Sequence, residues 1–267
     1  MEMKLPYGKG AVSFELPRER LAGILQGRPC VPEKDAVTIV RESMENPIGS
    51  KRLWQLAQGK KDIVILTSDH TRPVPSRVIL PLMLKELRRG SPGARIRILV
   101  ATGCHRKMTG KELKEKFGEE LLAEEEIVTH DCEDEENLVS LGTLPSGGEL
   151  KINRLGVWAD LLVAEGFIEP HFFSGFSGGR KSVLPGIASR TCVHYNHNSA
   201  FIDHPCARAG ILEGNPIHED MVYAAKKAGL AYIVNVVFNS ERQVIASFAG
   251  DGELAHGAGC RFVRELT

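Results

Sequence analysis

The sequence predicts an α/β fold with a mainly parallel sheet that is covered by helices on both faces. Short apolar runs at 62–67 and 160–164 are bounded by polar residues, as expected for strands that are buried on both sides. Segments with helical apolar spacing lie between such runs, and this alternation is typical of parallel α/β sheets. We therefore expect a Rossmann-like domain.

The expected elements follow one another along the chain. Strands are predicted at 11–16, 62–67, 95–101, 138–142, 149–153, 160–164, 231–238 and 244–249. Helices are predicted at 33–44, 50–58, within 76–89, and at 111–117, 215–228 and 253–266. The strands at 138–142 and 149–153 flank a Pro-Ser-Gly-Gly turn and are expected to form a hairpin.

Local signals mark the ends of several helices. Gly59 and Gly229 stand where a left-handed residue commonly ends a helix. Thr109 and Glu112 have the spacing of a capping box, in which each side chain accepts from the other residue's backbone N–H. Pro81 predicts either a kink within its helix or a helix that begins at the proline.

The composition is that of a soluble globular protein. The 267 residues include 34 basic and 34 acidic side chains, and 42% are hydrophobic. A balanced charge supplies no basic field for nucleic acid, and no apolar run approaches the ~20 residues needed to span a membrane. The first ten residues lack the pattern of a secretory signal, so we expect a cytoplasmic protein whose six cysteines are reduced.

Reactive side chains are concentrated in three loops, each of which follows a predicted strand. These loops are 68–73 (SDHTRP), 102–106 (TGCHR) and 166–186 (GFIEPHFFSGFSGGRKSVLPG). Ligands of open α/β sheets bind at the carboxyl ends of the strands, where helix N-termini and variable loops meet. The three loops therefore predict one shared site.

The richest segment is SGFSGGRK at 174–181. Its glycines and serines could turn backbone N–H groups toward an anion, with Arg180 and Lys181 adding positive charge. It is not a Walker A motif, because Arg180 stands where the second glycine is required. Phosphate or mononucleotide binding remains the functional interpretation, and a solvated loop is the alternative.

Histidines and two charged residues complete the candidate site. His105 and His171 each follow a strand and could serve as an acid or base, although either could equally be structural. Arg72 could clamp a carboxylate, and Asp69 could hold a sugar hydroxyl or cap its own loop. A possible metal set is His194 and His197, spaced i, i+3, with His204 downstream.

These segments resemble the lactate racemase family, whose members use a nickel-pincer nucleotide. The similarity is carried by SDHTRPVPS at 68–76, ILVATGCHR at 98–106, EGFIEPHFFSGFSGGRKSVLPGIAS at 165–189 and NHN at 196–198, and extended by ENPIGS at 45–50 and SFAGD at 247–251. Lys107 replaces a proline and Asn198 a serine of the family pattern. The resemblance covers nearly the whole chain and implies that residues 1–267 are the family's N-terminal, cofactor-binding domain, without its C-terminal domain.

The resemblance implies a role for each matching residue. Lys181 would carry the cofactor, a pyridinium-3-thioamide-5-thiocarboxylic acid mononucleotide, through a thioamide bond, and His197 would bind its nickel. His105 and His171 would be the acid/base pair, one for each enantiomer of a short 2-hydroxy acid, during hydride transfer to the pyridinium ring. Other positions would contact the cofactor or substrate: Asp69, His70, Thr71, Arg72, Ser174, Ser177 and Gly178, with Arg72 on the substrate.

The resemblance also implies partners, namely a small 2-hydroxy acid and the enzymes that synthesise the cofactor. Two other functions stay open at this point. One is a cofactor-binding or carrier module without activity of its own. The other is a phosphate-binding transferase or hydrolase, which Lys181 disfavours because simple phosphate binding has no use for a covalent attachment.

Overall fold

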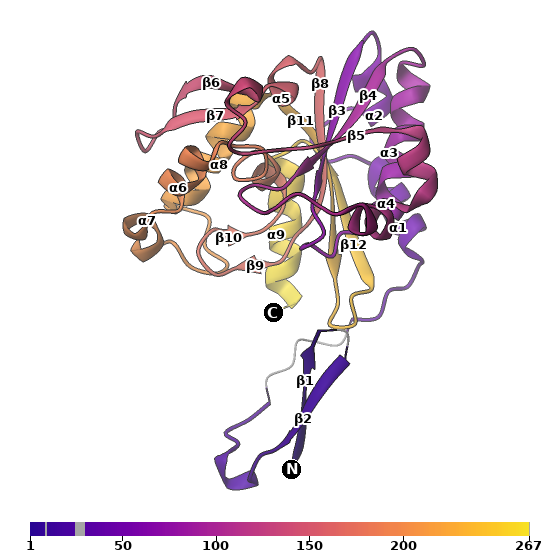
Figure 1. Ribbon diagram of the computed structural model, residues 1–267. Helices are drawn as coiled ribbons and strands as arrows, with labels where there is room; N and C mark the ends of the chain where they lie inside the picture. The colour runs from indigo at the N-terminus through magenta and orange to yellow at the C-terminus, as the bar shows by residue number, and fades with distance from the viewer. Residues whose placement is uncertain (9, 25–29, 267) are drawn as a thin grey trace.

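A six-stranded sheet forms the centre of the computed structural model, which describes residues 1–8, 10–24 and 30–266 (Figure 1). In spatial order its strands are β12 (Val244–Gly250), β11 (Leu230–Phe238), β8 (Leu161–Phe167), β3 (Asp62–Ser68), β4 (Arg95–Ala101) and β5 (Glu126–Thr129). All neighbours pair in parallel except β11 and β12, which are antiparallel. This confirms the predicted α/β fold with a mainly parallel sheet.

The strand order identifies the place where a ligand would bind. Numbered along the chain, the six strands lie in the order 3-2-1-4-5-6, which is the Rossmann order. From β3 the chain moves outward to β4 and β5, and then returns to add β8, β11 and β12 on the other side. The carboxyl ends of β3 and β8 therefore flank the switch point, where loops diverge and leave a crevice.

Helices cover both faces of the sheet (Figure 1). The first face carries α1 (Ala36–Glu45), α2 (Leu53–Ala57), α3 (Ser76–Gly90) and α4 (Gly110–Glu124). The second face carries α5 (Arg154–Trp158), α6 (Arg190–Asn196), α8 (Pro216–Ala228) and α9 (Leu254–Leu266), and α7 (Ser199–Asp203) contacts α8. The short helices η1 (Arg18–Arg20), η2 (Glu135–Asn137) and η3 (Gly179–Ser182) lie in connecting segments.

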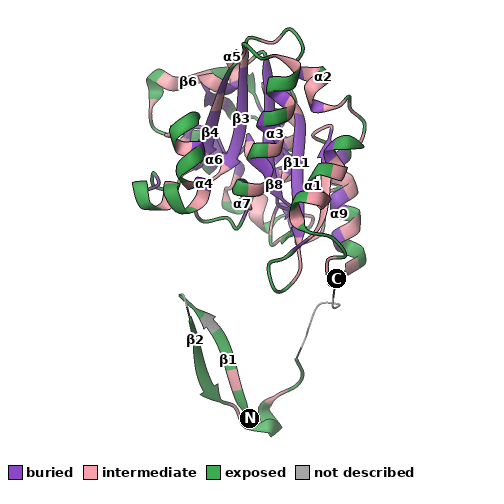
Figure 2. Cartoon of the chain, turned by 90° about the vertical axis from the view of Figure 1, so that its right-hand side faces the viewer, coloured by how far each residue is buried: buried purple, intermediate pink, exposed green. Residues whose placement is uncertain are grey.

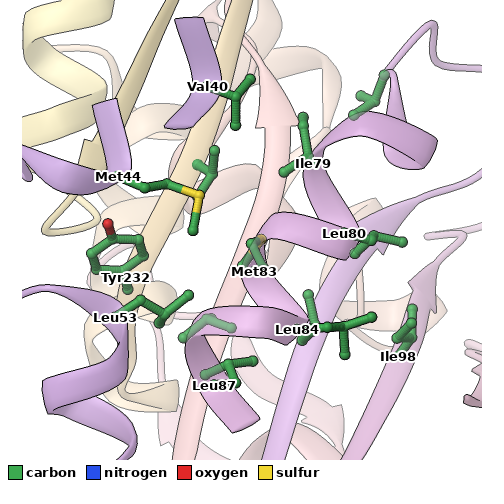
Figure 3. Close-up of a cluster of buried hydrophobic side chains, with 14 of the residues drawn as sticks. Val40, Met44, Leu53, Ile79, Leu80, Met83, Leu84, Leu87, Ile98 and Tyr232 are labelled. Carbon is green, nitrogen blue, oxygen red and sulfur yellow. The ribbon is translucent and has the colours of Figure 1, made fainter. Parts of the chain in front are cut away.

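Alternating side chains of β3 explain why both faces are covered. Ile63 and Ile65 pack into the cluster beneath α1 to α4, whereas Val64 and Leu66 pack into the cluster beneath α8. All four are fully buried, and each contributes roughly 1.5–3 kcal/mol by leaving water. The first cluster gathers side chains of α1, α2 and α3, and Tyr232 of β11 lies at one side of it beside Met44 and Leu53 (Figure 3).

Most helix-end signals are confirmed. The capping box of Thr109 and Glu112 begins α4, and Gly229 ends α8 in the left-handed conformation. Gly59 follows α2 with a φ of 74°. The helix around Pro81 begins at Ser76, so the alternative that it begins at the proline is wrong; Pro81 lies inside the helix.

Small antiparallel pairs lie outside the central sheet. The predicted hairpin is present as β6 (Leu138–Thr143) and β7 (Glu149–Asn153), and β9 (Pro170–His171) pairs with β10 (Gly175–Phe176). The strand predicted at 11–16 is β2 (Gly10–Glu15), which pairs only with β1 (Glu2–Tyr7). This pair projects from the body of the protein and is almost entirely exposed (Figure 2).

Several elements escape sequence prediction because they are short. The edge strand β5 and the helices α5, α6 and α7 contain only four to seven residues each. The six cysteines, all within the described ranges, are free thiols. None of the helices described is long and apolar enough to cross a membrane.

Candidate active site

A cavity of about 590 Å³ opens at the carboxyl ends of β3, β4 and β8. The three loops that the sequence singles out all contribute to its lining, together with His197 from the segment after α6. This is the switch point of the sheet, where the loops that follow β3 and β8 run in opposite directions and leave space for a ligand. The tertiary structure thus brings the three loops to one site.

Asp69 and His105 form a hydrogen-bonded pair at this cavity. Asp69 Oδ2 lies 2.7 Å from His105 Nδ1, and the carboxylate is buried whereas the imidazole is half exposed. Burial alone would raise the pKa of Asp69, but hydrogen bonds from Thr71 and His105 outweigh it and leave that pKa below its ordinary value. An ionised Asp69 accepts the Nδ1 proton, so the lone pair of His105 is on Nε2.

Thr71 links this pair to Arg72. Its backbone N–H and its hydroxyl both donate to Asp69 Oδ1, at 3.0 and 2.6 Å. Arg72 Nη1 in turn donates to the Thr71 hydroxyl at 3.0 Å, and the exposed guanidinium lines the cavity. Asp69 therefore caps its own loop, as one of the two sequence interpretations proposed, and it also orients His105.

His171 lies in a more apolar setting. Its ring stacks on Phe172, with centroids 4.8 Å apart, and meets the edge of Phe173 at 4.6 Å. Burial and then the nearby positive charge of Lys181 lower the pKa of His171 to about 3. The neutral ring accepts the Ser174 N–H at Nδ1, 3.3 Å away, which leaves its own proton on Nε2.

Lys181 extends from η3 into the same cavity. Its Nζ donates to the hydroxyl of Ser174 at 3.0 Å and lies 5.9 Å from the centre of the Phe173 ring. Burial, followed by the charges of Arg180 and Arg72, lowers the pKa of Lys181 well below its ordinary value. A lowered pKa makes the nucleophilic form of this amine more accessible than that of an exposed lysine.

His197 is the residue of this site that is best suited to bind a metal. Its Nδ1 is buried without a hydrogen-bond partner among the described residues, and its ring meets the edge of Phe173 at 5.0 Å. Burial, and then Lys181, lower the pKa of His197 to about 4, so the imidazole is neutral and can donate a lone pair. Within the described ranges, no group of three histidine, cysteine or acidic side chains could hold a metal ion. A metal here would take most of its ligands from another molecule.

The glycine-rich loop does not present a free ring of N–H groups. The backbone N–H groups of Ser174, Phe176, Ser177, Gly179 and Lys181 already donate to protein acceptors. These five N–H groups are therefore not free to bind an anion.

Individual residues of that loop have distinct positions. Ser177 and Gly178 line the cavity, but the Ser177 hydroxyl is bonded to the backbone of Phe167 and Glu169. Ser174 is fully buried and contacts Lys181. The sequence interpretation of Arg180 as part of the anion site also needs correction, since its side chain is buried behind the loop and does not line the cavity.

Three of the histidines that the sequence nominates as site residues do not line the cavity. The Nε2 atom of His70 lies 3.4 Å from Glu112 on α4. His194 is exposed on α6, and His204 ends α7, where its Nδ1 accepts from the Cys206 N–H. The proposed shared metal set of His194, His197 and His204 is therefore not assembled.

Glu165 is a cavity residue to which the sequence analysis gave no role. It is fully buried, and one carboxyl oxygen is hydrogen-bonded to the hydroxyls of Thr67 and Ser76. Burial raises the pKa of Glu165 against the opposing charge of Lys116, so the group tends to keep its proton. The signal that could have revealed it is a single carboxyl group within the otherwise apolar strand LLVAEGF.

Comparisons with known proteins agree with this arrangement. A family model described as the lactate racemase N-terminal domain matches residues 7–210. The lactate racemase of Thermoanaerobacterium thermosaccharolyticum is 57% identical over 269 residues, which cover 99% of this chain and 62% of the relative. The lactate racemase of Lactiplantibacillus plantarum is 52% identical over 265 residues, 98% of this chain and 62% of the relative.

Solved structures support the same relationship. The structure of the lactate racemase apoprotein from Thermoanaerobacterium thermosaccharolyticum superimposes with a TM-score of 0.92 over 100% of this chain and 63% of that one. A crystal structure of a protein from Thermotoga maritima, 24% identical, has a TM-score of 0.71 over 91% of this chain and 61% of that one, and shows the shared fold. The chain spans about 62% of the length of the curated relatives it matches. It belongs to the family of lactate racemase N-terminal domains.

Proposed function

We propose that this chain is the cofactor-bearing part of a racemase that interconverts the enantiomers of lactate or a related short 2-hydroxy acid. The observation that carries the proposal is the convergence of the Asp69–His105 pair, His171 and Lys181 on one cavity. The two histidines differ in their chemical state, as an acid/base pair requires. His105 offers a lone pair at Nε2, and neutral His171 offers a proton at Nε2.

The cavity residues fit a nickel-pincer nucleotide. The lowered pKa of Lys181 favours the nucleophilic amine that a thioamide linkage requires, and the unpartnered His197 Nδ1 suits a metal whose remaining ligands belong to the cofactor. When bound, this cofactor would supply the hydride acceptor, because no side chain of the protein can play that part. A cofactor with this structure would have to be made and delivered by dedicated synthesis enzymes, which we propose as partners.

The protein's own residues would bind the acid and move its proton. Arg72 projects into the cavity and would pair with the substrate carboxylate. His105 would remove the hydroxyl proton at Nε2, and ionised Asp69 would stabilise the resulting imidazolium. His171 would face the opposite side of the substrate and return a proton from Nε2. For the other enantiomer the roles would reverse, with deprotonated His171 as the base and protonated His105 as the acid. The free cysteines accord with a cytoplasmic location, which we also propose.

The test is intact mass and nickel analysis of protein produced together with the cofactor-synthesis enzymes, followed by a chiral assay of both lactate enantiomers. We expect added mass on Lys181, bound nickel and racemisation. His105→Ala should keep the mass and the nickel but lose turnover, whereas Lys181→Ala should lose all three. Absence of added mass and nickel in the unmodified protein would refute the cofactor assignment. Loading without turnover of any short 2-hydroxy acid would instead identify a carrier module.

A further inference from the structure

Arg180 is a buried arginine whose charge is not matched by a carboxylate. Its exposure is 3%, and no acidic side chain in the described part of the chain lies within ion-pair distance of it. A cation removed from water is costly unless other polar groups surround it. For Arg180 these groups belong to the segment that precedes it, which is the loop leading to Lys181.

The guanidinium is hydrogen-bonded to four carbonyl groups of that loop, and the longest of these bonds joins Nη1 to Ser177 O at 3.4 Å. Nη2 donates to Ser174 O at 2.8 Å, and Nη1 donates to Phe176 O at 2.7 Å and to Gly178 O at 3.1 Å. Ser174 O and Gly178 O each accept one further hydrogen bond, from the Phe176 and Lys181 backbone N–H groups, so Arg180 supplies an additional donor to carbonyls that already shape the turn. The planar, forked guanidinium can satisfy them together, which a lysine ammonium cannot do in the same geometry. The path of the loop from Ser174 to Gly178 thus depends on this side chain.

Two helices fix Arg180 from behind. Its Nε donates to His218 Nδ1 on α8 at 3.0 Å, and its Nη1 lies 3.0 Å from His256 Nε2 on α9. His256 Nε2 also lies 2.8 Å from Ser177 O, so this ring is itself tied to the loop. Gly179 lies directly beside it, since a Cβ there would come within 2.9 Å of the His256 ring. Arg180 and His256 therefore both contact the loop directly, whereas His218 contacts Arg180.

We propose that Arg180 is a positioning residue that fixes the Ser174–Gly178 carbonyls and thereby directs Lys181 into the cavity. The inference deepens the proposed function, because Lys181 is the attachment point of the cofactor in that proposal. Two contacts connect the clamp to the lysine. Ser174 is held by Arg180 through its carbonyl and accepts from Lys181 Nζ through its hydroxyl. Arg180 is also the residue next to Lys181, and its charge favours the neutral amine.

The experiment measures the acylation of Lys181 in protein without cofactor. Acetic anhydride transfers an acetyl group to Nζ with release of acetate and the amine proton, and peptide mass spectrometry gives the rate at each lysine. Exposed Lys111 serves as the reference within each sample. The variants are Arg180→Gln and Arg180→Lys, and the latter keeps the charge but not the fork. Arg97→Gln is the matched control, since Arg97 is largely buried but paired with Asp62 and Glu126 far from the cavity.

We expect Arg180→Gln and Arg180→Lys to slow acylation of Lys181 about tenfold or more relative to Lys111, because small displacements of a reacting group have large effects on rate. Amide hydrogen exchange at 174–179 should become faster in both variants and remain unchanged in Arg97→Gln. If Arg180→Gln does not fold, His218→Ala, which removes one anchor, should show the same changes to a smaller degree. A normal Lys181 rate in Arg180→Lys, or an equal loss in Arg97→Gln, would overturn the proposal. If unmodified protein fails to acquire cofactor, the proposed function fails, but the acylation ratios still decide the role of Arg180.

Discussion

Asp69 and His105 are hydrogen-bonded across two neighbouring strand ends, with 2.7 Å between Oδ2 and Nδ1. Asp69 directly follows β3, and His105 lies in the loop after β4. The two strands pair in parallel with Ser68 opposite Ala101, so their carboxyl ends, and the loops that follow, meet at the same edge. The parallel pairing of β3 and β4 therefore brings Asp69 and His105 within hydrogen-bonding distance of each other.

Asp69→Asn should reverse the proton arrangement on His105. An amide can donate to Nδ1, which would move the ring proton to Nε2 and remove the lone pair that faces the cavity. We expect turnover of loaded protein to fall about 10²–10⁴-fold, the range of general base catalysis. Chiral chromatography measures the loss, and intact mass should show an unchanged cofactor load. The control is Asp160→Asn, which alters a carboxylate that accepts from the Lys61 and Asp62 backbone, remote from the cavity. Equal turnover in the two variants would contradict the assignment.

Gly178→Ala should destabilise the loop that carries Lys181. Gly178 has a φ of 81°, and a Cβ there would lie 2.6 Å from Asn235 Oδ1 and 2.7 Å from Phe167 O. Backbone strain and the collision together should lower the free energy of unfolding by more than the ~1 kcal/mol expected from strain alone. Gly59→Ala isolates the strain, because Gly59 has a φ of 74° but nothing within 4 Å of the added carbon. Urea unfolding measures the free energy of unfolding of both variants. Equal decreases would contradict the prediction, because they would show that the loop can move to accommodate the added carbon.

Acidification should destabilise the protein through its buried histidines. Burial, and then Lys181, lower the pKa of His171 to about 3 from an ordinary value of 6.5, so between these pH values the unfolded chain binds the additional proton. The stability that depends on neutral His171 is therefore present above pH 6.5 and is lost as the pH falls toward 3. His171→Gln should reduce the loss of unfolding free energy between pH 7 and pH 5. His194→Gln, at an exposed position, is the control and should leave the loss unchanged. The same loss in all three proteins would contradict this account.

Glu165→Gln should be tolerated, whereas Glu165→Ala should not. Burial raises the pKa of Glu165. The stability that depends on protonated Glu165 is therefore fully present below the ordinary pKa of a glutamate, and it is lost as the pH rises through the raised pKa. Glutamine keeps a neutral hydrogen-bonding group and should remove that decline. Alanine would leave Thr67 and Ser76 without their shared acceptor, at a cost of about 1–3 kcal/mol for each unsatisfied group. Chemical denaturation at pH 5 and pH 8 gives the free energy of unfolding of the unmodified protein and of both variants. A glutamine variant as unstable as the alanine variant would indicate that Glu165 is ionised.

The directions of side chains within the loops could not be predicted from the sequence. His70 and His105 both follow predicted strands, yet His105 lies at the cavity and His70 contacts Glu112. Arg180 and Lys181 are adjacent, and the sequence predicts that both add positive charge to an anion site. In the structure, only Lys181 lines the cavity, whereas Arg180 is buried on the other side of the loop. Neighbouring residues in a turn can diverge in this way because their directions depend on backbone angles that several distant contacts determine together.

The sequence by itself determined the α/β class, most helix ends and the three reactive loops, because apolar periodicity, caps and glycines act within a few residues. It also carried the family motifs that contain Lys181, His105 and His171, the residues for which we propose roles in the reaction. Only the tertiary structure decided the strand order, the pairing of Asp69 with His105, the burial of Glu165 and the inward turn of Arg180. These features arise from contacts between residues far apart in the chain, since burial and electrostatic environment exist only after distant segments have packed together.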